Sequence, residues 1–296
     1  MHRFPERRPA LAPRTLWRRS HPLGSISKVT FRCERGADAL AYVCIPESAR
    51  PPYRFIICLQ GHTSGAHQSI ALSADERRPI RVEGDRDFAI ACMRHGFAAL
   101  ALEQRSFGQR SERRQRRKSF HNGCEDAALR ALMLGRTLLG ERVYDVDRAI
   151  DYLTARRDVD LDQVGVMGNS GGGTVSIYAA ALLPRIGFAM PSSSLCSFRE
   201  SIMTIHHCTD NYVPALYDLA DLGDILGLAA PKPIVVVGAT NDPIFPYPGL
   251  RRAYAQLRRI YAAAGAEDRL GLYVGRRGHR FYAEPAFGAL LRLLRE

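Results

Sequence analysis

The 296-residue chain is predicted to be an α/β protein built on a mostly parallel, eight-stranded sheet with helices on both faces. Short, fully apolar runs such as Phe55–Leu59 have the length and composition of buried parallel strands. These runs alternate with longer stretches of helical period, as in βαβ units. Small and polar residues follow these runs. Functional loops gather at the carboxyl ends of parallel strands, which is where such residues would lie.

Eight segments have strand character, and the first two flank a turn-rich stretch that predicts a hairpin. The strands are expected at 26–33, 39–45, 55–59, 97–102, 164–167, 186–190, 233–238 and 270–274. Between them, helices are expected at 86–95, 125–156, 175–183, 249–264 and 285–295, the second broken near Gly140.

The chain is expected to contain a single large domain. Residues 1–24 are rich in Arg and Pro and are predicted to be a basic peripheral arm, with the domain itself spanning 25–296. Residues 197–228 have mixed character and precede a buried strand, so they are expected to form a cap insert.

The formal net charge of +12 is concentrated in two segments. Residues 1–20 carry +5 and residues 105–118 carry +6. This distribution is unlike a nucleic-acid footprint, and the loop contains only Phe107 as a stacking aromatic. The loop is either a solvated surface segment or, through Arg105 near the site, an attractor for an anionic ester.

The seven cysteines are odd in number and show no C-x-x-C spacing, which predicts buried thiols rather than a disulfide framework or a zinc site. The alternative is a single pairing of Cys196 with Cys208. No run approaches the ~18 apolar residues of a membrane helix, and the N-terminus is a poor secretory signal. We therefore expect a cytoplasmic protein with no membrane or nucleic-acid partner, no metal and no cofactor. The sequence predicts no particular oligomeric state.

One stretch points to chemistry. Gly168-x-Ser170-x-Gly172 follows an apolar strand and opens a helix, the context of a nucleophile elbow. A Cβ beside the serine would collide with neighbouring backbone at so sharp a corner. The alternative is a glycine-rich turn with an exposed serine.

A serine nucleophile needs a base, and the base needs an acid that orients it. Asp242 follows the strand at 233–238, and His279 follows the strand at 270–274, which is the order serine, acid, histidine. Rival acids and histidines fall in the expected cap, where they are less well placed: Asp210, Asp218, Asp221, Asp224, His206 and His207.

Two backbone donors are expected to form an oxyanion hole. One is the N–H of Gly171, directly after the serine, and the other is the N–H of His62, with Thr63 as the second choice. Gly61 would let that loop turn back towards the site, and His121 is expected to line the pocket. The alternative for residues 60–65 is an ordinary polar loop.

These residues resemble the α/β-hydrolase superfamily, nearest the acetyl xylan esterase and dienelactone-hydrolase-like branch. The resemblance covers about residues 38–295 and rests on five motifs: Leu59-Gln60-Gly61-His62, residues 103–108, residues 140–145, Gly168-Asn169-Ser170-Gly171-Gly172 and residues 241–246. Three positions depart from the family pattern. Gln60 stands where many relatives have His, Gly171 where sugar deacetylases have Gln, and Ser170 where dienelactone hydrolases have Cys.

The resemblance implies a hydrolase that cleaves small carboxylic esters, including acetyl esters of sugars, without a metal or organic cofactor. The partner would be a small-molecule ester substrate. A peptidase of the prolyl-oligopeptidase type is one alternative, although the chain has little room for a gating domain. The other is a catalytically silent scaffold that acts as a binding protein.

Overall fold

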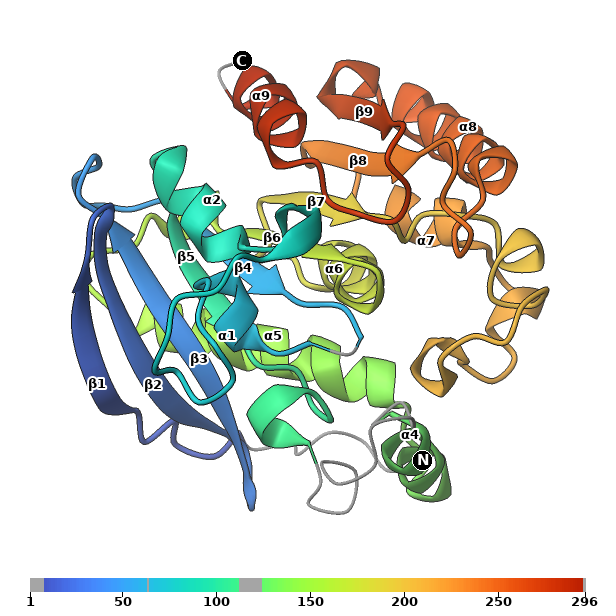
Figure 1. Cartoon of the computed structure of the whole chain (residues 1–296). Coiled ribbons are helices and arrows are strands. Elements are labelled where there is room, and N and C mark those ends of the chain that lie inside the picture. The colour runs from blue at the N-terminus through green and yellow to red at the C-terminus, as the bar shows by residue number, and fades with distance from the viewer. Residues whose placement is uncertain (1–7, 63, 112–123, 295–296) are drawn as a thin grey trace.

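The computed structural model describes residues 8–62, 64–111 and 124–294. They form a nine-stranded sheet in the order β1-β2-β3-β5-β4-β6-β7-β8-β9 (Figure 1). The pairs β1–β2, β2–β3 and β3–β5 are antiparallel. The remaining neighbours are parallel, so the predicted α/β class with a mostly parallel sheet is confirmed.

The strands are β1 (Arg14–His21), β2 (Gly24–Glu34), β3 (Ala37–Pro46), β4 (Phe55–Leu59), β5 (Ala98–Leu102), β6 (Gly165–Asn169), β7 (Phe188–Ser192), β8 (Ile234–Ala239) and β9 (Leu270–Gly275). The helices of the described ranges are α1 (Ala66–Ser69), α2 (Phe88–Arg94), α4 (Glu125–Met133), α5 (Leu138–Thr154), α6 (Gly171–Leu182), α7 (Leu222–Gly227), α8 (Tyr247–Ala263) and α9 (Ala283–Leu293). None of these helices is long and apolar enough to cross a membrane.

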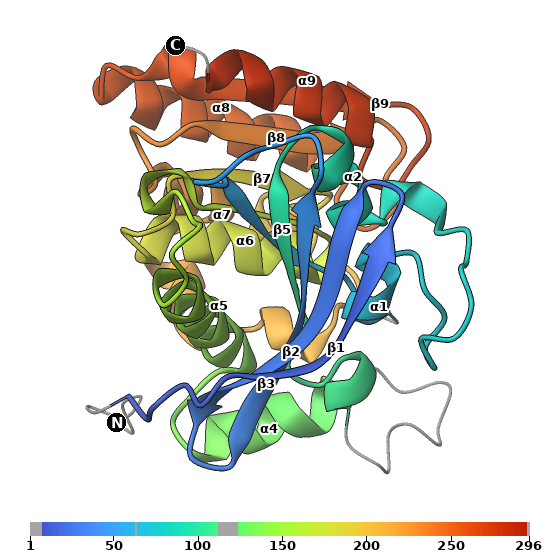
Figure 2. The ribbon, with the colours of Figure 1, turned by 90° about the vertical axis from the view of Figure 1, so that its left-hand side faces the viewer.

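Two apolar layers cover the sheet, one on each face (Figures 1 and 2). Helices α5, α6, α7 and α8 contribute to one layer, and α1, α2 and α9 contribute to the other. In β4, Phe55, Ile57 and Leu59 belong to the first layer, whereas Ile56 and Cys58 belong to the second. Burial on both faces explains why this strand reads as a continuous apolar run.

The N-terminal prediction was wrong over part of its length. Residues 14–21, expected in a peripheral arm, form the edge strand β1 antiparallel to β2 (Figure 2). Trp17 anchors this strand by donating its indole N–H to the Glu76 carboxylate at 2.9 Å. The described part of the sheet therefore has nine strands rather than eight. Charged, exposed side chains protect a sheet edge from further pairing, and they also hide the alternation that identifies a strand.

The expected cap insert divides into two parts. Residues up to 221 run through short 3-10 turns at Phe198–Glu200, Thr209–Asn211 and Leu216–Asp218. Helix α7 follows and packs against α6 and α8 as part of one helix layer. Only the first part remains a candidate cap over the carboxyl ends of the strands.

Candidate active site

Ser170 occupies a sharp corner between β6 and α6. Its backbone has φ 58° and ψ −125°, a conformation that is strained for a residue with a Cβ. An added Cβ at Gly168 would lie 2.6 Å from the Leu59 carbonyl oxygen, and one at Gly172 would lie 2.0 Å from it. Both glycines are therefore required by the close approach of β4, as the motif predicts for a nucleophile elbow.

Asp242 and His279 meet at the carboxyl ends of β8 and β9. The Nδ1 atom of His279 lies 2.8 Å from the Asp242 Oδ2 atom. The other Asp242 oxygen accepts the backbone N–H groups of Ile244 and Phe245 at 2.9 and 3.1 Å. Burial would raise the pKa of Asp242, but these hydrogen bonds and the His279 charge outweigh burial and lower it. The carboxylate is thus held ionised and aimed at the imidazole.

Ser170 and His279 line one cavity of about 320 Å³. Its other lining residues are Gly61, His62, Arg86, Asn169, Ile205, His206, His207, Cys208 and Ile244. The ring of Phe245 stacks on His279 with a centroid distance of 6.0 Å. The serine, the imidazole and the buried carboxylate are therefore gathered at one cavity by three different strand ends.

His207 adds a polar group to the cavity wall. Its Nδ1 atom lies 3.0 Å from the Asn211 side-chain nitrogen, which also donates to Asp210. Burial lowers the pKa of His207 to about 4, so the ring is neutral near pH 7. Because Nδ1 accepts from an amide, the proton belongs on Nε2, a buried atom with no partner in the described structure. That atom is a candidate donor to a ligand.

The expected oxyanion donors lie beside the serine. Gly171 is the first residue of α6, and an N–H in the first turn has no acceptor within its helix. In β4 and β6, Leu59 pairs with Gly168, which brings the loop of Gly61 and His62 against the elbow. An added Cβ at Gly61 would lie 3.0 Å from the Ser170 Cβ. Thr63, the second choice, lies outside the described residues.

The side chain of His62 has partners that the sequence did not predict. Its Nε2 atom lies 3.0 Å from the Asp210 Oδ2 atom, and the buried Arg142 donates to the same oxygen. Burial lowers the pKa of His62, but the Asp210 carboxylate outweighs burial and raises it to about 9. Residues 62, 142 and 210 come from distant parts of the chain, so no local spacing could have revealed this contact.

Comparisons with known proteins agree with this fold. The model of the acetyl xylan esterase (AXE1) family matches residues 82–216. The chain superposes on a crystal structure from Bacteroides fragilis NCTC 9343, described as a putative acetyl xylan esterase, with a TM-score of 0.83 and 19% identity over 99% of this chain and 84% of that one. The chain therefore has the fold of these esterase structures, and its residues 82–216 are similar to the acetyl xylan esterase family.

Two further proteins are similar to this chain. "Putative hydrolase YtaP" of Bacillus subtilis (strain 168) is 29% identical over 176 residues, which are 58% of this chain and 56% of that protein. The match therefore spans little more than half of the relative's length. A glucuronoyl esterase from Solibacter usitatus superposes with a TM-score of 0.70 and 17% identity over 99% of this chain and 87% of that one.

Arg105 does not occupy the place that the sequence predicted for it. Its guanidinium forms ion pairs of 2.7 Å with Glu34, 3.1 Å with Glu141 and 2.7 Å with the buried Asp145. It is not among the residues that line the cavity. The neighbouring carboxylates compensate its charge, so the expectation of a substrate-attracting Arg105 is not met. His121 and residues 112–118 of the basic loop lie outside the described residues.

Three of the rival acids, Asp210, Asp221 and Asp224, have partners other than His279. Asp210 contacts His62 and Arg142. Asp221 and Asp224 form a capping box at the start of α7. Ser192, a rival serine, donates to the Asn169 side chain at 3.0 Å instead of standing at an elbow. Asp210 also contacts an imidazole on the cavity wall, that of His62, but it shares its oxygen with Arg142, whereas Asp242 pairs with His279 at the carboxyl ends of β8 and β9.

Proposed function

We propose that this chain is a serine carboxylic-ester hydrolase, with Ser170 as nucleophile, His279 as base and Asp242 as orienting acid. The observation that carries the proposal is the 2.8 Å contact between His279 and Asp242 on a cavity shared with Ser170. A buried carboxylate that fixes Nδ1–H leaves Nε2 of the same ring as the basic atom.

The reaction would proceed through an acyl-enzyme. The Ser170 hydroxyl attacks the ester carbonyl while His279 takes the hydroxyl proton. The N–H groups of Gly171 and His62 stabilise the oxyanion of the tetrahedral intermediate. His279 then gives its proton to the leaving alcohol. Water attacks the acyl-enzyme with the same base, and the carboxylic acid leaves as Ser170 regains its proton.

Small esters, in particular acetyl esters of sugars, are the substrate class that we propose. A cavity of about 320 Å³ is at the small end of ligand pockets. Arg86 and the Nε2–H of His207 place donors on its wall, which suits a substrate rich in hydroxyl and carbonyl oxygens. The match to the acetyl xylan esterase family model supports the acetyl group.

We also propose a cytoplasmic location. All seven cysteines are buried and free, which is the state that a reducing compartment maintains.

Three substrates test the proposed reaction: p-nitrophenyl acetate, an acetylated xylo-oligosaccharide and a prolyl peptide anilide. We expect turnover of both acetates and none of the anilide. Faster cleavage of the anilide would favour a peptidase. A folded protein that hydrolyses no ester in a panel of acyl lengths would favour a binding scaffold and overturn the proposal.

A further inference from the structure

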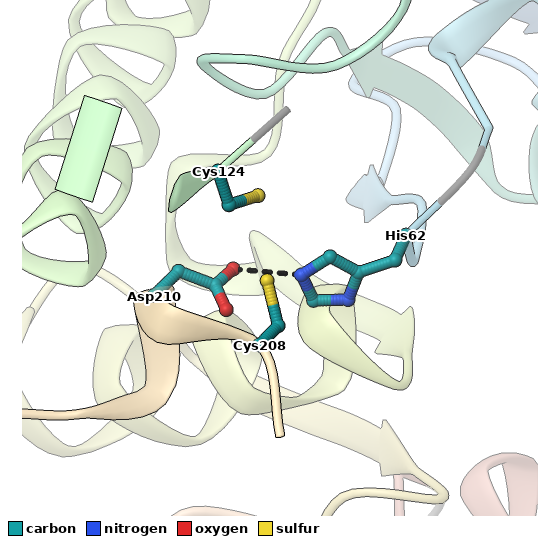
Figure 3. Close-up of side chains that lie close together, drawn as sticks. All are labelled: His62, Cys124, Cys208 and Asp210. Carbon is teal, nitrogen blue, oxygen red and sulfur yellow. Dashed lines mark hydrogen bonds and ion pairs between the residues drawn. The ribbon is translucent and has the colours of Figure 1, made fainter. Parts of the chain in front are cut away.

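Four side chains of metal-ligating type converge on one another (Figure 3). Two of them, His62 and Cys208, also line the cavity of Ser170 and His279. The four are His62 from the loop after β4, Cys124 at the start of α4, and Cys208 and Asp210 at the 3-10 turn Thr209–Asn211. One ligand atom from each lies within 4.8 Å of the others. Cys124, Cys208 and Asp210 are buried. None of these side chains is needed as nucleophile, base or orienting acid.

We propose that these four side chains form a structural zinc site. Two thiolates, one imidazole and one carboxylate are a four-ligand set that zinc accepts in tetrahedral geometry. Ligand atoms of such a site stand roughly 3.3–3.8 Å apart, given the usual zinc–sulfur and zinc–nitrogen bond lengths. The observed limit of 4.8 Å requires only a small inward movement of side chains. With four protein ligands the ion has no open position for a catalytic water.

The surrounding charges balance a divalent ion. Two thiolates and the Asp210 carboxylate would carry three negative charges, and the ion with Arg142 would carry three positive charges. Arg142 donates to the Cys124 sulfur at 3.0 Å and to the Asp210 Oδ2 atom. Asn211 donates to the other Asp210 oxygen at 3.0 Å. Donors of this kind orient ligands and stabilise their charge in metal sites.

A Cys124–Cys208 disulfide is the main rival, since two thiols could give up two electrons and two protons to an oxidant. The positions of His62 and Asp210 favour the metal. The Nε2 atom of His62 and the carboxylate of Asp210 converge on the same point as the two sulfurs, which a disulfide does not require. Arg142 likewise contacts one sulfur and the carboxylate together.

The ion would connect three segments that are far apart in the sequence. Its ligand His62 also packs over Gly171, with ring atoms within 3 Å of an added Cβ at that position. Zinc would therefore fix the loop that carries one proposed oxyanion donor. This consequence for catalysis rests on the proposed esterase function, whereas the site itself does not.

The test is the metal content of untagged full-length protein purified without chelator. We expect one zinc ion per chain by elemental mass spectrometry. Replacement of zinc by Co²⁺ should give a thiolate-to-cobalt charge-transfer band. The variants Cys124→Ser and Cys208→Ser should lose most of the zinc and the band. Cys44→Ser, which removes a buried thiol from a different apolar cluster, should keep both.

Several outcomes would overturn the site. One is metal-free protein that takes up no stoichiometric zinc after reduction. Another is zinc content that is equal in Cys124→Ser and in the unmodified chain. A non-reduced protein that holds no zinc, and in which thiol titration finds two fewer thiols than the seven cysteines of the chain, would establish the disulfide instead. Esterase turnover is assayed separately: zinc in an inactive protein would refute the proposed function alone, and activity without zinc binding would refute the site alone.

Discussion

The imidazole of His62 occupies the space where a side chain at Gly171 would begin. An added Cβ at Gly171 would lie 2.7 Å from His62 Cε1 and 2.9 Å from Nδ1. The ring has little freedom to retreat because Nε2 is held at 3.0 Å from Asp210. The two proposed oxyanion donors are thus coupled through side-chain packing. This contact gives a physical reason for glycine at a position where sugar deacetylases carry glutamine.

Gly171→Ala is expected to displace the His62 ring and the loop that carries its N–H. Since removal of one oxyanion donor costs about 10²–10³-fold in kcat, we expect a loss of up to about 10²-fold. Steady-state kinetics with p-nitrophenyl acetate measures it. Gly288→Ala is the matched control, because an added Cβ there meets only the end of Arg292 at 3.9 Å. Equal kcat for both variants would contradict the coupling.

Asp242→Asn is expected to lower kcat by about 10³–10⁴-fold with little change in stability, because the amide favours the wrong imidazole tautomer. The asparagine oxygen can still accept the N–H groups of Ile244 and Phe245. Asp221→Asn is the control. It keeps an oxygen that can accept at the cap of α7, and asparagine caps helices about as well as aspartate, so both stability and kcat should stay nearly unchanged. The reverse pattern would show that the acid has been misassigned.

Arg105→Gln is expected to act on stability rather than on substrate binding. It removes one partner of Asp145, Glu34 and Glu141, which keep ion pairs with Arg110 or Arg136. The cost should therefore stay below about 3–5 kcal/mol, the cost of a buried charge left without a partner. The ratio of kcat/KM for an anionic ester to that for a neutral ester should stay the same. Denaturant unfolding and paired kinetics measure the two effects. A selective loss with the anionic ester would restore Arg105 as a substrate-binding residue.

Glu76 should give the stability of the fold a defined pH dependence. Burial would raise its pKa, but hydrogen bonds from Lys28, Tyr42 and neighbouring groups outweigh burial and lower the pKa from 4.5 to about 2. Because the folded-state pKa is depressed, the stabilisation is complete above the unfolded value and is lost as the pH falls towards 2.

Glu76→Gln should therefore destabilise the protein by about 3 kcal/mol near pH 7, since it breaks a buried ion pair with Lys28. The difference in the free energy of unfolding between the variant and the unmodified chain should shrink as the pH falls through 4.5 towards 2. Urea unfolding at a series of pH values measures it. A constant difference across that range would mean that Glu76 acts by packing alone.

The parts of the fold that sequence analysis predicted correctly are those with local signals. Strands covered on both faces, such as β4, are marked by continuous apolar runs. The elbow is marked by glycines that the approach of Leu59 requires. Asp242 and His279 could be paired because chain order and strand ends restrict the choice.

Features that depend on distant partners could not be predicted. Arg105 follows a strand as a substrate residue would, and only the fold brings Glu34, Glu141 and Asp145 to it. The break expected near Gly140 lies instead at 134–137. Gly140 is inside the first turn of α5, where its N–H is capped by the Thr137 hydroxyl at 3.1 Å. The cluster around His62 joins three separate segments, so its cysteines showed no metal-binding spacing.

The proposed nucleophile is tested most directly by a fluorophosphonate, which bonds covalently to an activated serine as fluoride leaves. We expect one label per chain, located by peptide mass spectrometry on Ser170 and absent from Ser170→Ala. The same variant should lose at least ~10⁴-fold in kcat with its fold intact. A label on Ser192, Ser193 or Ser194, or full ester turnover by Ser170→Ala, would contradict the proposed active site.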